Sequence, residues 1–560
     1  MKNVFRLCLL LLGVMIANLT YSQSELTIKK YILFETYQKE GFDKMIAQYE
    51  QTINAVHKQD RNKSFYEDLL NNLGYDFMTK NLISEALKVF EFNAKKHPNS
   101  ANCYDSWAEA SLKSGDKEKA IEYYKRALEL NPDFDNPRNV LISLNVIQLD
   151  TIFSRKQLEE DLGMIMDAMI LHPKLYEYTS KEEFENLYKQ IQAKLKDDMT
   201  ADDFLKLAYP LLERIGCGHS SLLPSMSYFG NPEGKTVPIS VRFEEDKTYI
   251  LKTFPEGEIP MGSRLLSIND KPVNEIASEL TNYFSTDGLI NQSGKRYAAG
   301  RLFELMYPKF FIPRDKYKFE YQAYGSDEIL ELELDAFDTK TIWMPKMMTQ
   351  NPFHVEYRKD LDAAVIKLKT FWFGGNNDEY DAFLESTFAK IKEVKIQNII
   401  LDMRGNGGGD PIAAAHLFSY IAPKPLKYYA DVFSAEYAIL AQPIELAKNH
   451  FDGHLFTIID GGGYSTTGHI VSLIKYHKIG LIVGSELGST YTCNDNKMRV
   501  PLKHTRLTLS VARSIFTTAV ENMKADQGVL PDYPIGFSVD NLVKGIDTEM
   551  EFIIKEINKE

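Results

Sequence analysis

The stretch NIILDMRGNGGG at residues 398–409 decides the fold of the C-terminal third of this chain. An apolar run typical of a buried strand ends in a glycine-rich turn, and a helix-compatible stretch follows. The same order returns in LFTIIDGGGYS at residues 455–465. A strand, a tight turn and a helix start expose backbone N–H groups at the positive end of a helix. Ser465 is therefore a candidate nucleophile, and the other turn can supply N–H groups to an oxyanion.

Strands and helices alternate around these turns. We expect strands at 363–368, 397–402, 455–460 and 480–484, with helices at 377–393, 411–421 and 466–477. Such alternation predicts a mainly parallel sheet with right-handed crossovers, in which sites lie at the carboxyl ends of strands. Both glycine turns lie at such ends.

Three motifs in this order resemble one enzyme family. LDMRGNGG (401–408), the serine turn about sixty residues further on, and GVLPD (528–532) resemble the tail-specific, or C-terminal-processing, serine peptidases. That family includes the tricorn core protease and the interphotoreceptor retinoid-binding protein. The resemblance spans roughly residues 152–540. It implies an α/β fold with a crotonase-like ββα spiral core, placed here at 355–558.

The remaining domains are predicted from period and composition. Residues 65–133 repeat with a period of 34, so that Ala86 returns as Ala120 and Phe90 as Tyr124. This pattern resembles tetratricopeptide repeats, and we assign an α-helical repeat solenoid to residues 27–145. A helical block follows at 152–218. Residues 235–335 look mostly β, and IPMGSRLLSINDKPV (259–273) resembles the core of a PDZ-like domain.

The first residues differ from the rest. Lys2 and Arg6 precede an apolar run from Leu7 to Leu19, and Ser22 lies where a signal peptidase would cut. We predict a signal peptide at 1–22, hence export to a periplasmic or extracellular location without stable membrane insertion after cleavage. A retained membrane anchor is the alternative.

Charge and cysteine content narrow the classes of function. The 560 residues carry a formal net charge of −13, which argues against nucleic acid or an anionic membrane as a partner. Cys103, Cys217 and Cys493, which remain after signal cleavage, do not make a disulfide framework, although one pair can form. Without CxxC or HExxH we predict no metal site and no cofactor.

A serine nucleophile needs a base within hydrogen-bond reach. Tail-specific members use a lysine at a position that here falls near Thr490, where no lysine occurs. The tricorn-like branch uses a histidine at the end of the helical block, and the turn at His219 matches that place. The resemblance therefore implies His219 as the general base. His469, four residues after Ser465, is the alternative because i and i+4 share a helix face.

The resemblance also guides the choice of the remaining site residues. The tricorn-like branch places a glutamate before the GVxPD motif, where this chain departs from the pattern; Glu521 is preferred and Asp526 is the alternative. Backbone N–H groups of Thr466 and of Gly407 or Gly408 would form the oxyanion hole.

These features predict an exported serine endopeptidase that cleaves peptide or protein substrates through an acyl-enzyme. The repeats offer a concave face for a protein partner. Two other classes stay open: a catalytically inactive protein that binds a peptide or lipid ligand on the same fold, and a scaffold that works through its repeats. Labelling of Ser465 by a fluorophosphonate distinguishes the enzyme from both.

Overall fold

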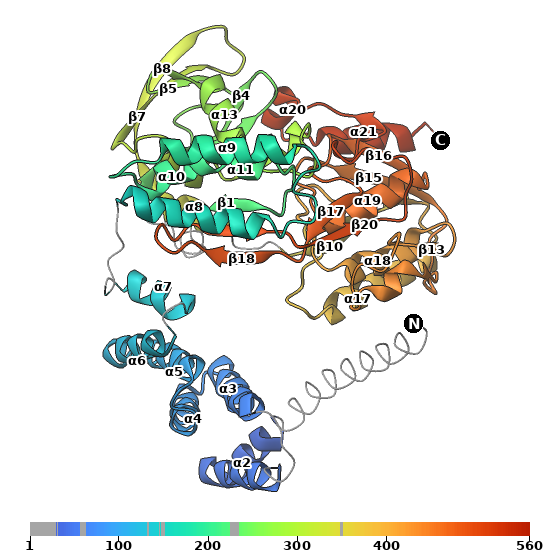
Figure 1. Cartoon of the computed structure of the whole chain (residues 1–560). Helices are drawn as coiled ribbons and strands as arrows, with labels where there is room; N and C mark the ends of the chain where they lie inside the picture. Colours follow the sequence, from blue (N-terminus) through green and yellow to red (C-terminus); the bar gives the residue numbers. More distant parts are fainter. Residues whose placement is uncertain are drawn as a thin grey trace. The chain divides into compact units, whose positions relative to one another are not determined.

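The computed structural model describes residues 30, 32–56, 63–131, 134–144, 146, 152–224, 234–347 and 351–559. The predicted signal peptide lies outside these residues. The chain divides into two compact units, Met1–Leu149 and Asp150–Glu560 (Figure 1). No helix among the described residues is long and apolar enough to cross a membrane.

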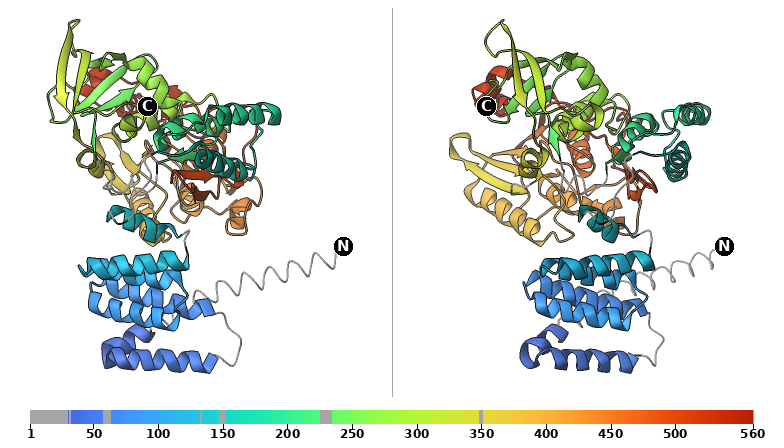
Figure 2. Two further views of the ribbon diagram at one scale, coloured as in Figure 1. Left: turned by 60° about the vertical axis from the view of Figure 1, so that its left-hand side comes forward. Right: turned by 90° about the vertical axis from the view of Figure 1, so that its left-hand side faces the viewer.

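The first unit is made of helices. They are α2 (Phe42–Val56), α3 (Lys63–Thr79), α4 (Ile83–Lys96), α5 (Ala101–Lys113), α6 (Lys117–Leu130) and α7 (Asp135–Ser143). Helices α3 to α6 stack side by side (Figure 2), with the small Ala86 and Ala120 fully buried at the crossings. Gly74 allows the closest approach, because a β-carbon there would lie 2.4 Å from the Phe90 ring. Helix α4 ends just before Pro98, while Pro132, its repeat equivalent, lies outside the described residues.

The second unit begins with the predicted helical block. It comprises α8 (Arg155–Met169), α9 (Lys181–Lys194), α10 (Ala201–Ala208) and α11 (Pro210–Glu213). Ser154, Ser180 and Thr200 each close a capping box, which satisfies N–H groups that a helix start leaves free. The block ends in the tight turn that carries His219.

An antiparallel sheet follows in the segment predicted to be PDZ-like. Its order is β3 (Ile239–Phe243), β4 (Thr248–Thr253), β5 (Arg264–Ile268), β7 (Lys316–Gln322) and β8 (Ile329–Asp335), with β6 (Lys271–Pro272) on β5. The chain between β6 and β7 is helical: α13 (Val273–Thr281), α14 (Gln292–Arg301) and α15 (Phe303–Phe310). The expectation of mostly β structure therefore fails for 273–310, where apolar residues at helical spacing pack on the sheet. The short pair β2 (Lys235–Thr236) and β9 (Phe337–Asp338), then α16 (Thr339–Met347), close this region.

The second sheet is the predicted parallel core. Its order is β10 (Phe353–Arg358), β11 (Ala363–Leu368), β12 (Asn398–Asp402), β15 (His454–Ile459), β16 (Leu481–Gly484) and β21 (Tyr533–Pro534), and only β10 is antiparallel. One face packs with α17 (Asp378–Val394), α18 (Pro411–Ile421) and α19 (Thr466–Tyr476). The other face packs with α21 (Thr548–Ile557). All four predicted strands and three predicted helices of this core form within two residues of the expected bounds.

Small elements connect the helical block to the core. Strand β1 (Ser221–Leu223) directly follows the His219 turn and pairs antiparallel with β19 (Thr508–Val511), which also pairs with β18 (Met498–Pro501). Strands β17 (Thr492–Asp495) and β20 (Ser514–Thr517) form a second ribbon. The remaining elements are η1 (Lys359–Leu361), β13 (Leu426–Lys427), η2 (Ala438–Ala441), β14 (Pro443–Ile444) and α20 (Val539–Val543). The β1–β19 pairing fixes the His219 turn to the C-terminal part of the chain.

Candidate active site

Ser465 lies on a strained turn between β15 and α19. Its backbone adopts φ 56° and ψ −124°, a conformation that an L-residue rarely holds, and Ser465 is the residue that caps α19. The parallel pairing of β12 with β15 brings the first glycine turn beside it. The two predicted turns therefore meet at one edge of the sheet.

Asn406 and Asp460 link the two glycine turns. The buried Asn406 accepts through Oδ1 from the Gly408 N–H and from the Thr467 hydroxyl, both at 2.9 Å, and its carbonyl accepts from the Tyr464 N–H at 3.0 Å. Asp460 Oδ1 accepts from the N–H of Gly405 at 2.8 Å and of Gly462 at 2.9 Å. These bonds hold the spacing between the turns.

The two glycines proposed for the oxyanion hole differ in what surrounds them. Gly408 packs against the serine turn: a β-carbon there would lie 2.8 Å from Ser465 Cβ, and its φ is +87°. A β-carbon at Gly407 would meet no atom within 4 Å. Since the Gly408 N–H already donates to Asn406, the amides of Gly407 and Thr466 are the ones that remain for an oxyanion; neither donates a hydrogen bond within the described chain.

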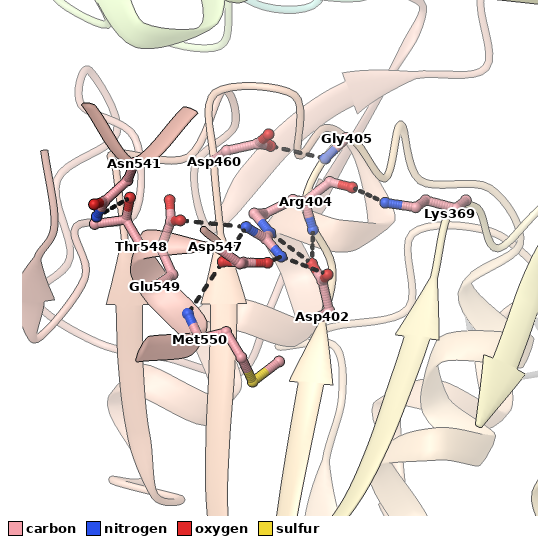
Figure 3. A network of polar contacts seen from close by, with 10 residues as sticks. All are labelled: Lys369, Asp402, Arg404, Gly405, Asp460, Asn541, Asp547, Thr548, Glu549 and Met550. Carbon is pink, nitrogen blue, oxygen red and sulfur yellow. Dashed lines mark hydrogen bonds and ion pairs between the residues drawn. The ribbon is translucent and has the colours of Figure 1, made fainter. Parts of the chain in front are cut away.

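Arg404 anchors the first glycine turn to the C-terminal helix (Figure 3). Its guanidinium donates to both Asp402 oxygens at 2.8 and 2.9 Å and to both Asp547 oxygens at 2.7 and 3.0 Å. Glu549 accepts a further bond at 3.2 Å. Burial disfavours its charge, but these carboxylates outweigh burial and raise the pKa of Arg404. Asp402 and Arg404 thus pair with each other, and the network fixes the glycine turn to the start of α21.

The His219 turn lies against the serine turn. A β-carbon at Gly218 would lie 2.8 Å from the ring of Tyr464, the neighbour of Ser465. The Ser220 hydroxyl accepts from the Ala512 N–H at 3.2 Å, next to the β1–β19 pairing. His219 is buried, although it stands 246 positions before Ser465 in the sequence.

Asp287 is the carboxylate that faces His219. Its Oδ1 lies 3.9 Å from His219 Nδ1 and accepts from the Gly218 N–H at 2.9 Å, while its Oδ2 accepts from the Ser489 hydroxyl. On the other side of the ring, His219 Nε2 lies 3.8 Å from Asp495 Oδ2. Asp287 and Gly288 precede α14, and Gly288 fits closely against the Asp526 backbone.

These contacts shift the ionisation of both partners. Burial lowers the pKa of His219, but Asp287, Cys217 and Asp495 outweigh burial and the pKa is raised well above its ordinary value. Burial raises the pKa of Asp287, yet His219, Ser489 and the Gly218 amide outweigh it and the pKa is lowered. An imidazolium and a carboxylate therefore stabilise each other in this buried place.

His469, the alternative base, is engaged elsewhere. Its Nε2 lies 3.1 Å from Cys493 Sγ, and its Nδ1 lies 3.4 Å from the Tyr429 hydroxyl. Burial lowers the pKa of His469 to about 4, so the ring is neutral. Burial raises the pKa of Cys493, while the neighbouring Ser465 opposes that rise. His469 therefore faces the Cys493 thiol, and neither histidine side chain hydrogen-bonds to the Ser465 hydroxyl within the described chain; the backbone N–H of His469 donates to the Ser465 carbonyl at 3.2 Å.

The two acids proposed for the third position do not face His219. Glu521 is exposed, and Asp526 meets the Asp287 loop through its backbone, where its carbonyl accepts from the Ile290 N–H at 3.3 Å. The described ion pairs of His219 go to Asp287 and Asp495 instead. Glu521 thus stays a prediction from the resemblance, and Asp287 is an acid that the structure brings to the histidine. Spacing before the GVxPD motif could not point to Asp287, because Asp287 lies in the loop before α14, far away in sequence.

Sequence reasoning missed three residues of this site. Asp287 and Asn406 gave no signal beyond a polar side chain next to a glycine. Cys493 had a weak signal, since it stands shortly after the position near Thr490 where a lysine was sought. The three free cysteines among the described residues, Cys103, Cys217 and Cys493, are all buried.

Comparisons with known proteins agree with the core and the repeats. Residues 362–535 match peptidase family S41, and residues 101–134 match the tetratricopeptide repeat. The crystal structure of mature CPAF aligns with a TM-score of 0.51 at 14% identity, covering 71% of this chain and 96% of CPAF. The complex of mature CPAF with lactacystin gives 0.52 at 13% identity, covering 72% and 99%. At sequence identities this low, the structural likeness establishes a shared fold and nothing more. No curated protein matches the chain in sequence.

The parallel core, its paired glycine turns and the match of residues 362–535 to peptidase family S41 support a serine-type peptidase, a hydrolase. The segment that matches the tetratricopeptide repeat, residues 101–134, lies in the helical unit that precedes this core in the sequence.

Proposed function

We propose that this chain is an exported serine endopeptidase that works through an acyl-enzyme on Ser465. In this proposal His219 Nε2 takes the proton from the serine hydroxyl, and Asp287, whose Oδ1 lies 3.9 Å from Nδ1, stabilises the imidazolium that forms. The amides of Gly407 and Thr466 stabilise the oxyanion, which they can reach because a glycine at 407 leaves the approach open.

One observation carries this proposal. A serine in a strained backbone conformation begins a helix at the carboxyl end of a parallel strand, and a buried histidine on the adjoining turn faces a buried carboxylate. The Ser465 side chain makes no capping hydrogen bond to its own helix, which suits a nucleophile. Hydrogen bonds between nucleophile and base are often loose before substrate binds, so the missing Ser465–His219 bond is compatible with the role.

The other domains supply substrate handling in this proposal. Tetratricopeptide repeats bind proteins through their concave face. In the PDZ-like sheet, β8 pairs on one side with β7 and forms the edge of the sheet, where an extended peptide can add as a strand. Export rests on the apolar segment at residues 7–19, which the positive Lys2 and Arg6 precede.

A fluorophosphonate probe tests the proposal on the full chain. Wild type should be labelled, and Ser465→Ala should not, because loss of a triad serine lowers the rate about 10⁶-fold. The thermal midpoint of Ser465→Ala should stay at the wild-type value or above it, since alanine removes only one hydroxyl. Labelling that persists in Ser465→Ala would place the nucleophile elsewhere.

A binding protein without activity is the second candidate. The observation in its favour is that the Ser465 hydroxyl makes no hydrogen bond with the side chain of His219 or His469 among the described residues, while His469 Nε2 lies 3.1 Å from Cys493 Sγ. In that case wild type would remain unlabelled at every pH, including pH values at which His219 is neutral.

A further inference from the structure

Cys217, His219 and Asp287 gather three metal-ligating atoms in one buried place. The Cys217 sulfur, one imidazole nitrogen of His219 and one carboxylate oxygen of Asp287 all lie within 4.8 Å of one another. A tetrahedral zinc ion, with ligand bonds of about 2.0–2.3 Å, holds its donors about 3.5 Å apart. The three side chains therefore need to close by about an ångström to bind such an ion.

The donor types of these three groups suit a thiophilic cation. Zinc in proteins is bound by cysteine sulfur, histidine nitrogen and aspartate oxygen, and each of the three side chains offers one of these atoms. Cys217 and His219 come from one turn, and Asp287 comes from the loop before α14.

A second observation points to a ligand. His219 Nδ1 is buried and has no hydrogen-bond partner, since its separation of 3.9 Å from Asp287 Oδ1 is too long for a hydrogen bond. A buried polar atom without a partner is uncommon in folded proteins and calls for an explanation such as a missing ion. His172 Nε2, the other imidazole nitrogen near Cys217, is also buried without a partner.

His172 lies next to Cys217 and can orient its sulfur. Its Nδ1 accepts from the Lys174 N–H at 3.1 Å, so the proton of the neutral ring lies on Nε2. That N–H is suited to donate to the Cys217 sulfur rather than to bind the ion. Outer groups of this kind orient the ligands of metal sites.

We propose that Cys217, His219 and Asp287 bind a zinc ion, with His219 as a ligand through Nδ1, and that the bound ion switches the peptidase off. The inhibitory half of this inference rests on the proposed function; the binding half does not. A neutral imidazole with a metal on Nδ1 carries its one proton on Nε2. That nitrogen then cannot accept the Ser465 proton.

Protons and charge balance in this switch. Zn²⁺ takes the place of any proton on His219 Nδ1 and on the Cys217 sulfur, and these protons leave to solvent. Because protons and the ion compete for the same atoms, metal binding should release protons and should weaken as pH falls.

The first experiment measures metal binding alone, on the full chain under reducing conditions, with Co²⁺ as the probe. Wild type should bind one Co²⁺ and show thiolate-to-cobalt charge-transfer absorption, which Zn²⁺ displaces. Cys217→Ser and Cys217→Ala should lose that absorption. Cys493→Ser is the matched control, a buried cysteine outside the ligand set, and should keep it, as should Ser465→Ala. Absence of the band in wild type, or its loss in Cys493→Ser alone, would overturn the site.

The second experiment measures labelling of Ser465 by a fluorophosphonate with and without Zn²⁺. Zinc should slow labelling of wild type at least tenfold, and a chelator should restore it. Cys217→Ser should lose the sensitivity to zinc, so that its labelling rate is the same with and without the ion. If Zn²⁺ binds but labelling is unchanged, the switch is refuted. If wild type shows the cobalt band and is never labelled, the proposed function fails while the metal site stands.

Zinc should also raise the thermal midpoint of wild type and leave that of the two Cys217 variants unchanged. For these comparisons both Cys217 variants have to keep the wild-type circular dichroism spectrum.

Discussion

Asp287→Asn should slow the reaction at Ser465 by about 10³-fold. When His219 takes the serine proton, it becomes an imidazolium with Asp287 Oδ1 at 3.9 Å from Nδ1. Coulomb's law at that distance, with an effective dielectric constant of about 20, gives about 4 kcal/mol. Each ~1.4 kcal/mol of transition-state stabilisation is a factor of ten in rate, hence the expected loss. Asparagine keeps an oxygen for the Gly218 N–H, so the change removes charge more than structure.

The assay is the second-order rate of fluorophosphonate labelling as a function of pH. Because the pKa of His219 is raised, the wild-type rate should rise with pH through a midpoint above the ordinary histidine value of about 6.5. Asp287→Asn should move that midpoint to lower pH, so the two rates are compared on their alkaline plateaus. The stabilisation of the fold by this pair should be full between about pH 4 and pH 6.5, lost as pH rises through the folded pKa of His219, and lost as pH falls through the folded pKa of Asp287.

Glu521→Gln is the matched control, because Glu521 is exposed and makes no ion pair with His219 within the described chain. It should label at the wild-type rate with an unchanged midpoint. The reasoning is refuted if Asp287→Asn retains its plateau rate and midpoint, or if Glu521→Gln loses as much as Asp287→Asn. Equal thermal midpoints of both variants would show that neither effect comes from unfolding.

The glycine turn gives a paired test. Gly407→Ala should keep the wild-type stability, because its β-carbon meets no atom within 4 Å, yet it should lower the labelling rate. Gly408→Ala should lose more than about 1 kcal/mol of unfolding free energy in urea, because its φ is +87° and its β-carbon would lie 2.5 Å from the Tyr464 carbonyl oxygen. The reverse order of stabilities would contradict this account. Arg404→Met leaves Asp402, Asp547 and Glu549 without their cation. Because these ion pairs are partly exposed, the change should lower the free energy of unfolding in the same urea titration by about 2 kcal/mol. Lys390→Met is its control, because Lys390 pairs with Glu393 on the exposed side of α17, and it should change the stability little. Deletion of residues 23–150 should leave labelling and short-peptide hydrolysis intact, because the repeats form a separate compact unit, while cleavage of a partner-delivered substrate falls. An equal loss of cleavage rate on both substrates would mean that the repeats build the site.

The sequence by itself determined the elements of the core and the repeats. The alternation after residue 355 predicts every strand that flanks the two glycine turns, because buried parallel strands read as continuous apolar runs between turn residues. The 34-residue period predicts the buried Ala86 and Ala120, because each repeat has to place a small residue where its helices cross closely. Ser465 was found for the same reason: its position at the end of such a strand is a local property.

Only the tertiary structure decided what surrounds the serine. Asp287 lies in a loop before α14, Cys493 on a ribbon after the core strands, and His219 on a turn that β1 fixes to β19. No local pattern links these segments, since their meeting depends on long-range pairing of strands and not on spacing along the chain. The choice of Glu521 followed spacing along the chain, which carries no information about Asp287. The acid that faces a buried histidine is the one that the packing of distant loops brings to it.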